Sequence, residues 1–200
     1  MKYVASLLVV SFFLFYSPVY AAQCANIAFD GSDADLLIGY AGVGQLESAS
    51  PFTPSQTCTI DEVGIRLAKS AGRTEDASVR IYQDSSSLPG TLIEACGTIP
   101  ATYSTYPTFG WATSTCAGTT QLSSGVQYWI GVASASTNDS LYLIPSAGGG
   151  PSGTKNWNGS DWTTVAPNST DLISFTMAGT ILAGGSAFSQ LAAEIIFLDF

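Results

Sequence analysis

Residues 62–68 have the sequence Glu62-Val63-Gly64-Ile65-Arg66-Leu67-Ala68, in which large apolar side chains occupy every second position. This period of two is typical of a β-strand with one buried face, because successive side chains in a strand point to opposite faces. Residues 77–82 repeat the alternation with Ala77, Val79 and Ile81. We expect both segments to be strands, joined by a polar connection.

The same kind of pattern continues along the chain. We expect further strands at residues 91–99, 109–116, 126–133, 141–144 and 171–182, and edge strands at 26–29 and 36–40. Residues 84–90 carry a strong turn signal, and Asn158-Gly159 within residues 157–162 predicts a hairpin with a type I′ turn. Helical periodicity is almost absent, and without crossover helices a parallel sheet is excluded. We therefore expect an all-β fold for residues 22–182, an antiparallel two-sheet β-sandwich of the jelly-roll type.

Both ends of the chain differ from this domain. Residues 1–21 combine the basic Lys2, an apolar stretch and the small Ala21, which is typical of a secretory signal peptide. The alternative is an uncleaved membrane anchor, although the apolar stretch is short for a span. Residues 183–200 are expected to be a C-terminal tail, either helical or extended. The mature protein is then secreted or on the cell surface, with the periplasm as the alternative, and has no membrane span.

The charge of the chain excludes several kinds of partner and chemistry. Six Lys and Arg residues accompany fifteen Asp and Glu residues, for a formal net charge of −9. No basic cluster is present to neutralise phosphates, so we expect no nucleic-acid binding.

The chain contains no histidine. It therefore has no Ser-His-Asp triad, no His general base and no His metal ligand.

Four cysteines, Cys24, Cys58, Cys96 and Cys116, lie in the mature part of the chain. An even number in an exported protein predicts two disulfides, for which three connectivities exist. We favour Cys96–Cys116 with Cys24–Cys58, because a hairpin that pairs residues 96 and 116 would turn at residue 106, where loop-forming residues are abundant. The alternative is a metal cluster, but the close cysteine spacing of zinc sites is missing.

Several short motifs follow one another in a characteristic order. They are Pro51-Phe52-Thr53-Pro54-Ser55, Ile60-Asp61-Glu62-Val63-Gly64-Ile65-Arg66-Leu67, Val79-Arg80-Ile81-Tyr82, Leu88-Pro89-Gly90-Thr91-Leu92, Leu122-Ser123-Ser124-Gly125-Val126-Gln127-Tyr128-Trp129-Ile130 and Trp157-Asn158-Gly159-Ser160-Asp161-Trp162. In this order they resemble a jelly-roll module of bacterial exported and surface proteins, including the choice-of-anchor proteins, and of some phage appendage proteins. The resemblance covers residues 45–182 and implies a shape like that of carbohydrate-binding modules. It implies no catalytic residues and does not include the cysteines.

Glycans bind to exposed aromatic faces flanked by hydrogen-bonding side chains. The candidate ligand-binding residues are Trp157, Trp162, Asn156, Asn158 and Asp161 at the expected hairpin, and Tyr106 and Trp111 near a loop that also holds Tyr103. The alternative for each aromatic side chain is a place in the sandwich core. A further candidate platform is an outward face with Arg66, Arg80, Tyr82 and Trp129, where a 62–84 hairpin register would place Arg66 opposite Arg80.

A candidate calcium site lies near the start of the domain. Residues 30–35 contain three carboxylates, Asp30, Asp33 and Asp35. Ca²⁺ takes six or more oxygen ligands, which this segment can supply in part. It lacks the spacing and the closing Glu of an EF-hand, so a solvated turn is the alternative. We expect no cofactor, with Ca²⁺ as the candidate exception.

These observations favour a secreted, non-catalytic module that binds glycans or another surface polymer. The alternative is a structural or adhesive protein of the cell surface or of an appendage, which packs against other protein chains through its sandwich. A more distant alternative is a glycoside hydrolase with two carboxylates, such as Glu62 and Asp84 meeting across a hairpin. We expect that the protein is not an enzyme.

Overall fold

The structure is a computed structural model that describes residues 22–27, 35–38, 46–69, 71–72, 74, 76–100, 102, 104–134, 142–145, 154–164 and 172–182. The expected signal peptide, the expected C-terminal tail, Asp30, Asp33 and Tyr103 lie outside these residues. No helix that is long and apolar enough to cross a membrane occurs within the described part of the chain.

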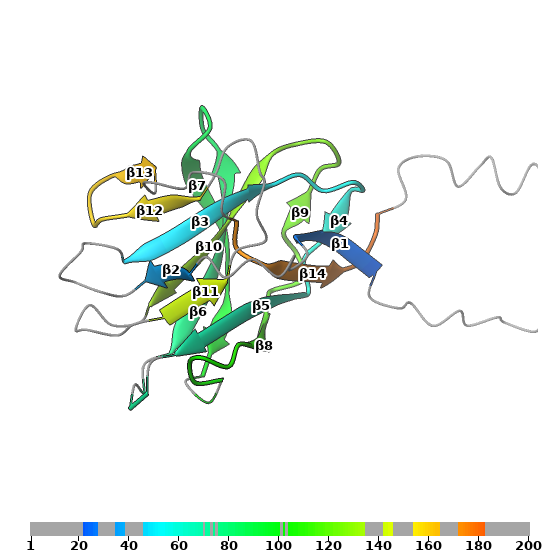
Figure 1. Ribbon diagram of the computed structural model, residues 1–200. Helices are drawn as coiled ribbons and strands as arrows, with labels where there is room; N and C mark the ends of the chain where they lie inside the picture. Colours follow the sequence, from blue (N-terminus) through cyan, green and yellow to red (C-terminus); the bar gives the residue numbers. More distant parts are fainter. Residues whose placement is uncertain are drawn as a thin grey trace, which may run out of the picture.

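The described residues form fourteen strands and no helix. The strands are β1 (Ala22–Ile27), β2 (Asp35–Ile38), β3 (Glu47–Phe52), β4 (Cys58–Thr59), β5 (Glu62–Lys69), β6 (Ala77–Asp84), β7 (Pro89–Ile99), β8 (Gly110–Thr115), β9 (Gln121–Leu122), β10 (Tyr128–Ser134), β11 (Tyr142–Pro145), β12 (Lys155–Trp157), β13 (Trp162–Thr164) and β14 (Phe175–Gly179) (Figure 1). The alternating segments at residues 62–68 and 77–82 are strands as predicted. The predicted final strand at 171–182 is shorter, because only its centre pairs continuously in β14.

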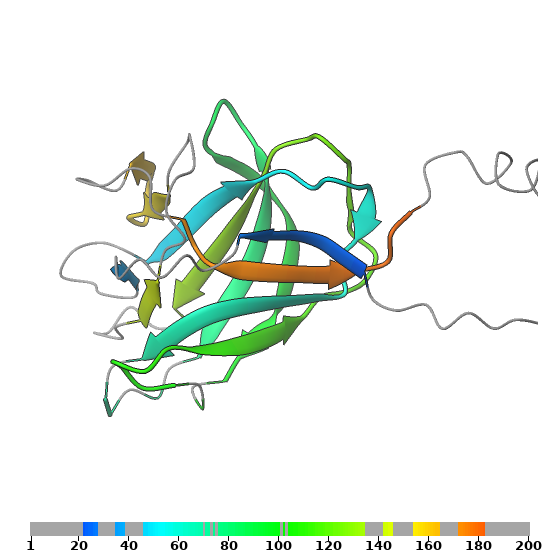
Figure 2. The same cartoon turned by 45° about the vertical axis from the view of Figure 1, so that its right-hand side comes forward.

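The strands form two six-stranded sheets in which all neighbours are antiparallel. The first sheet has the order β1-β14-β5-β11-β2, with β8 also paired to β5. The second sheet has the order β13-β12-β3-β10-β6-β7, and β4 with β9 forms a small separate ladder. Figure 2 shows β1 in blue and β14 in orange beside β5 of the first sheet.

The core lies between the two sheets. Ile65 and Phe175 of the first sheet are fully buried in one cluster with Val79 and Ile130 of the second. Phe52 of the second sheet meets Phe175 edge to face, with ring centroids 5.3 Å apart. Apolar side chains from both inner faces thus share one buried layer, which is the arrangement of a β-sandwich. The expectation of an all-β protein with antiparallel sheets is confirmed.

Both expected disulfides are present, but the hairpin that was expected to pair Cys96 with Cys116 is not. Cys24 is bonded to Cys58, and Cys96 is bonded to Cys116. β7 and β8 do not form a hairpin, because β7 pairs with β6 in the second sheet and β8 pairs with β5 in the first. The two strands nevertheless lie side by side where the sheets meet, since Ser114 donates a hydrogen bond from its hydroxyl to the carbonyl of Gly97. The Cys96–Cys116 disulfide therefore joins β7 to the residue directly after β8, and so connects the edges of opposite sheets.

The expected 62–84 hairpin does not exist. β5 and β6 follow each other in the sequence, yet β5 belongs to the first sheet and β6 to the second. Arg66 is therefore opposite Trp111 rather than Arg80, and Glu62 and Asp84 lie in different sheets. The proposed outward platform that combined Arg66 with Tyr82 and Trp129 is not formed. The chain crosses from one sheet to the other between β5 and β6, a connection that strand periodicity alone does not reveal.

Candidate functional site

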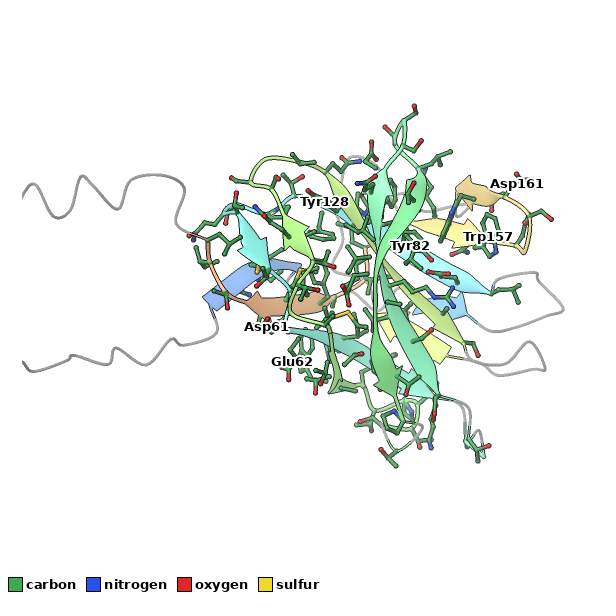
Figure 3. All side chains as sticks on the ribbon, turned by 180° about the vertical axis from the view of Figure 1, so that it is seen from behind. Asp61, Glu62, Tyr82, Tyr128, Trp157 and Asp161 are labelled. Carbon is green, nitrogen blue, oxygen red and sulfur yellow. A yellow bond between two sulfur atoms is a disulfide. The ribbon has the colours of Figure 1, made fainter. Side chains whose placement is uncertain are left out.

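The predicted hairpin at residues 157–162 is formed by β12 and β13. Trp157 and Trp162 are directly opposite each other, with ring centroids 5.4 Å apart. The turn is not of type I′, because Gly159 has a positive φ of 99° but Asn158 does not. The Asn158 side chain instead accepts hydrogen bonds through Oδ1 from the backbone N–H groups of Ser160 and Asp161, both at 2.9 Å. Figure 3 shows Trp157 and Asp161 together on this hairpin.

Trp162 packs over the outer face of the second sheet. Its ring centroid is 5.7 Å from that of Tyr82 in an edge-to-face contact, although three strands separate β13 from β6 in the sheet. The hairpin therefore curves over this face and closes a second small core with Ala49, Tyr82 and the fully buried Trp129. Trp157 and Trp162 are both half-buried. Trp162 is thus chiefly a clamp for the hairpin, while Trp157 keeps part of its surface in solvent.

The polar candidates of the hairpin are not all on one surface. Asn158 and Asp161 are exposed in the turn. Asn156 is only 5 % exposed, and its Oδ1 accepts a hydrogen bond of 2.6 Å from the Ser48 hydroxyl. Asn156 therefore faces the interior of the sandwich, away from the two tryptophans. The structure does not bring it to the surface where a ligand of the hairpin would lie.

A buried carboxylate that the sequence did not reveal lies next to this small core. Glu47 is 2 % exposed. It accepts hydrogen bonds from the Tyr82 hydroxyl at 2.7 Å and from an Arg80 guanidinium nitrogen at 2.8 Å. Its carboxyl group fills the space above Gly131, where a Cβ atom would collide with it. Burial raises the pKa of Glu47, and the bonds from Tyr82 and Arg80 offset only part of that effect.

Trp111 is the most exposed aromatic side chain among the described residues, with 51 % of its surface accessible. It extends from β8 away from the core, while the neighbouring Ala112 packs against the core on the other face. A Cβ atom at Gly64 of β5 would lie 3.7 Å from Cε3 of Trp111, so the indole ring covers the backbone at this glycine. Part of the ring thus lies against β5, and about half of the residue's surface is available to solvent.

A groove of about 430 Å³ opens beside Trp111. It is lined by Ile99, Pro100, Thr102, Ser104, Trp111, Ala112 and Thr113. Ser104 is held in place by its backbone carbonyl, which accepts a hydrogen bond of 2.9 Å from the N–H of Lys69. The groove therefore combines one broad aromatic surface with three side-chain hydroxyls, each of which can donate and accept hydrogen bonds.

Tyr106 lies in the loop that precedes Trp111 in the sequence. It is 48 % exposed and meets Phe109 edge to face, with ring centroids 5.9 Å apart. Its backbone N–H donates to the carbonyl of Lys69 at 2.9 Å, which fixes this part of the loop against the end of β5. Tyr106 and Trp111 are therefore both accessible near the end of β5, as a ligand-binding surface requires.

The hydroxyl residues Thr102, Ser104 and Thr113 of this groove were not among the residues expected from the sequence. Such residues are frequent throughout the chain, and nothing in their spacing distinguishes these three. A glycine within a strand pattern often marks a close approach of another group, but at Gly64 that group is the Thr176 hydroxyl, which a Cβ atom would meet at 2.6 Å. Trp111 is at an ordinary contact distance of 3.7 Å, so Gly64 did not mark this groove either.

The candidate calcium residues lie near the start of the chain. Asp30 and Asp33 lie outside the described residues, and Asp35 begins β2 with a side chain that is not described. Within the described ranges, no group of three or more Cys, Asp or Glu side chains could hold a metal ion.

Comparisons with known proteins assign the chain to no family. The chain matches no family model, no curated protein and no solved structure. The fold and the disulfides define its class as an all-β, disulfide-bonded protein with two antiparallel sheets. Two disulfides are typical of proteins in an oxidising, extracellular environment.

Proposed function

We propose that this protein is an exported, non-catalytic binding module of the jelly-roll type that holds a glycan against Trp111. The observation that carries the proposal is the exposed Trp111 ring beside a groove lined with hydroxyl side chains. The apolar face of a sugar ring packs on an aromatic face, and its hydroxyl groups exchange hydrogen bonds with neighbouring polar side chains. The groove provides such side chains in Thr102, Ser104 and Thr113, whose hydroxyl groups can exchange hydrogen bonds with a sugar.

The geometry favours this groove over the hairpin as the main site. Trp162 is engaged with Tyr82, and Asn156 is turned inward. Trp111 is 51 % exposed, and part of its ring lies over Gly64 of β5, so we expect its free surface to be positioned before a ligand binds. Such preorganisation lowers the entropy lost on binding. Trp157 remains a candidate for additional contacts with a long ligand.

A glycan array tests the proposal on the mature protein, residues 22–200, with and without Ca²⁺. We expect Trp111→Ala to weaken binding by about tenfold or more, because it removes the stacking surface. The matched control is Trp157→Ala, which removes an indole from the hairpin and should change affinity much less. A calcium requirement would support the candidate calcium residues Asp30, Asp33 and Asp35.

Failure to bind any glycan, by a folded sample with both disulfides intact, would contradict the proposal. The alternative of a structural or adhesive protein that packs against other chains would then be preferred. A loss of binding in Trp157→Ala, with affinity unchanged in Trp111→Ala, would locate the site at the hairpin instead.

A further inference from the structure

A second groove lies at the opposite end of the β6–β7 pair. It has a volume of about 350 Å³ and is lined by Gln83, Asp84, Val126, Gln127 and Tyr128. Asp84 is paired with Pro89 at the start of β7, whereas Ile99 at the end of β7 lines the Trp111 groove. Ten residue steps of about 3.3 Å each separate these ends, which is roughly 33 Å along the strand.

The Asp84 carboxylate of this second groove is held in a fixed position by three hydrogen bonds. Oδ1 accepts from Nε1 of Trp129 and from Nε2 of Gln127, both at 2.7 Å, and Oδ2 accepts from the N–H of Ser87 at 3.3 Å. Burial alone would raise the pKa of Asp84, but these bonds outweigh it and lower the pKa. The carboxylate is therefore charged at neutral pH, and Oδ2, which accepts a single hydrogen bond, keeps acceptor capacity for a ligand hydroxyl.

The other side chains that line this groove add hydrogen-bond donors and acceptors, and none of them is a cation. Gln127 uses Nε2 towards Asp84, which leaves its side-chain carbonyl as an acceptor. Gln83 is exposed and supplies a second amide with donors and an acceptor. Val126 is 47 % exposed and offers an apolar surface. A fixed carboxylate with no Lys or Arg in the lining disfavours anions, whereas vicinal hydroxyl groups match these donors and acceptors.

We propose that this groove is a second binding site for a neutral saccharide, so that one chain holds glycan at two places. The choice of saccharide as ligand rests on the function proposed for the Trp111 groove. The separation of the two grooves is too large for one short oligosaccharide to fill both. They instead bind two segments of a long polymer or two separate chains, and the two attachments raise the overall affinity for a polymer.

Isothermal titration with neutral tetrasaccharides measures the number of sites. The probes are cellotetraose, chitotetraose, xylotetraose and mannotetraose. We expect two ligands per wild-type chain, and one for either Trp111→Ala or the double variant Gln83→Ala/Gln127→Ala. Gln121→Ala removes an exposed glutamine of β9 outside both grooves and should leave two. Asp84 is kept in all variants, so that its bond to Trp129 is preserved.

Retention on the matching immobilised polysaccharide measures the combined effect. Loss of either groove should weaken retention by a larger factor than it weakens tetrasaccharide binding at the remaining site. One ligand per wild-type chain, with no effect of Gln83→Ala/Gln127→Ala, would overturn the second site and leave the Trp111 proposal intact. If Gln83→Ala/Gln127→Ala abolished all binding while Trp111→Ala bound as the wild type does, the Trp111 site would be overturned and the second groove would remain. No binding of any probe by the folded wild type would overturn both.

Discussion

At the scale of single residues, Glu47 shows how a charge is accommodated above a sheet. Its carboxyl group fits over Gly131 because that residue has no Cβ, and it bonds to Tyr82 and Arg80. A buried carboxylate is costly unless its partners compensate for the lost water. The raised pKa of Glu47 indicates that here burial outweighs those partners.

This pKa shift predicts the pH dependence of stability. Because the folded state raises the pKa of Glu47 above its ordinary value of 4.5, the folded state holds this proton more tightly than the unfolded state. The stabilising contribution is complete below about pH 4.5 and is lost as the pH rises through the folded pKa. We expect the free energy of unfolding of the wild type, relative to Glu47→Gln, to fall over that range. Urea unfolding at several pH values measures this difference.

Asp84 is the internal control for that experiment, since its pKa is lowered. Its contribution, relative to Asp84→Asn, should be complete above its ordinary pKa of 3.8 and lost as the pH falls through the folded pKa. The two carboxylates should therefore show opposite slopes. A Glu47 difference that instead grows with pH would show that the ion pair with Arg80 outweighs burial.

At the scale of elements, the β6–β7 hairpin contains backbone strain at its turn. Ser85 and Leu88 exchange backbone hydrogen bonds of 2.8 and 3.1 Å around Ser86 and Ser87. Both of these serines have positive φ, 55° and 65°, which residues with a Cβ adopt at a cost. Asn-Gly is the preferred sequence for such a two-residue turn.

Replacing these two residues should stabilise the protein. We expect the double variant Ser86→Asn/Ser87→Gly to raise the free energy of unfolding by about 1 kcal/mol, because Asn and Gly adopt positive φ more readily than Ser. Chemical denaturation measures the change. Ser55→Gly, at an exposed position without a positive φ, is the control and should lower stability, since glycine only adds freedom to the unfolded chain there. No gain in the double variant would contradict the assignment of strain to this turn.

At the scale of the whole molecule, the Cys96–Cys116 disulfide joins the edges of the two sheets. It spans 20 residues and connects β7 to the segment directly after β8. Trp111 and Thr113 of the ligand groove are on β8, and Ile99 of the same groove ends β7. The disulfide thus lies next to the elements that form the two sides of the groove.

Removal of this disulfide should affect both stability and binding. We expect Cys96→Ala/Cys116→Ala to lower the free energy of unfolding by about 3 kcal/mol, because the unfolded chain gains freedom. It should also weaken glycan binding at Trp111. Cys24→Ala/Cys58→Ala opens a loop of 34 residues and should cost a similar stability without a comparable loss of binding. Equal effects of both variants on affinity would show that the groove does not depend on the β7–β8 edge.

The sequence by itself determined that the protein is all-β and where most strands lie, whereas the argument for the cysteine pairing relied on a hairpin that the structure does not contain. Alternation of side chains is local, so it marks strands such as β5 and β6 without long-range information. Cross-strand partners depend on contacts between distant segments, and therefore only the tertiary structure placed Arg66 opposite Trp111 and put Asp84 in the other sheet. The aromatic candidates were named from residue type alone. Their exposure depends on what packs over them, so only the tertiary structure distinguished the accessible Trp111 from the clamped Trp162 and the buried Trp129.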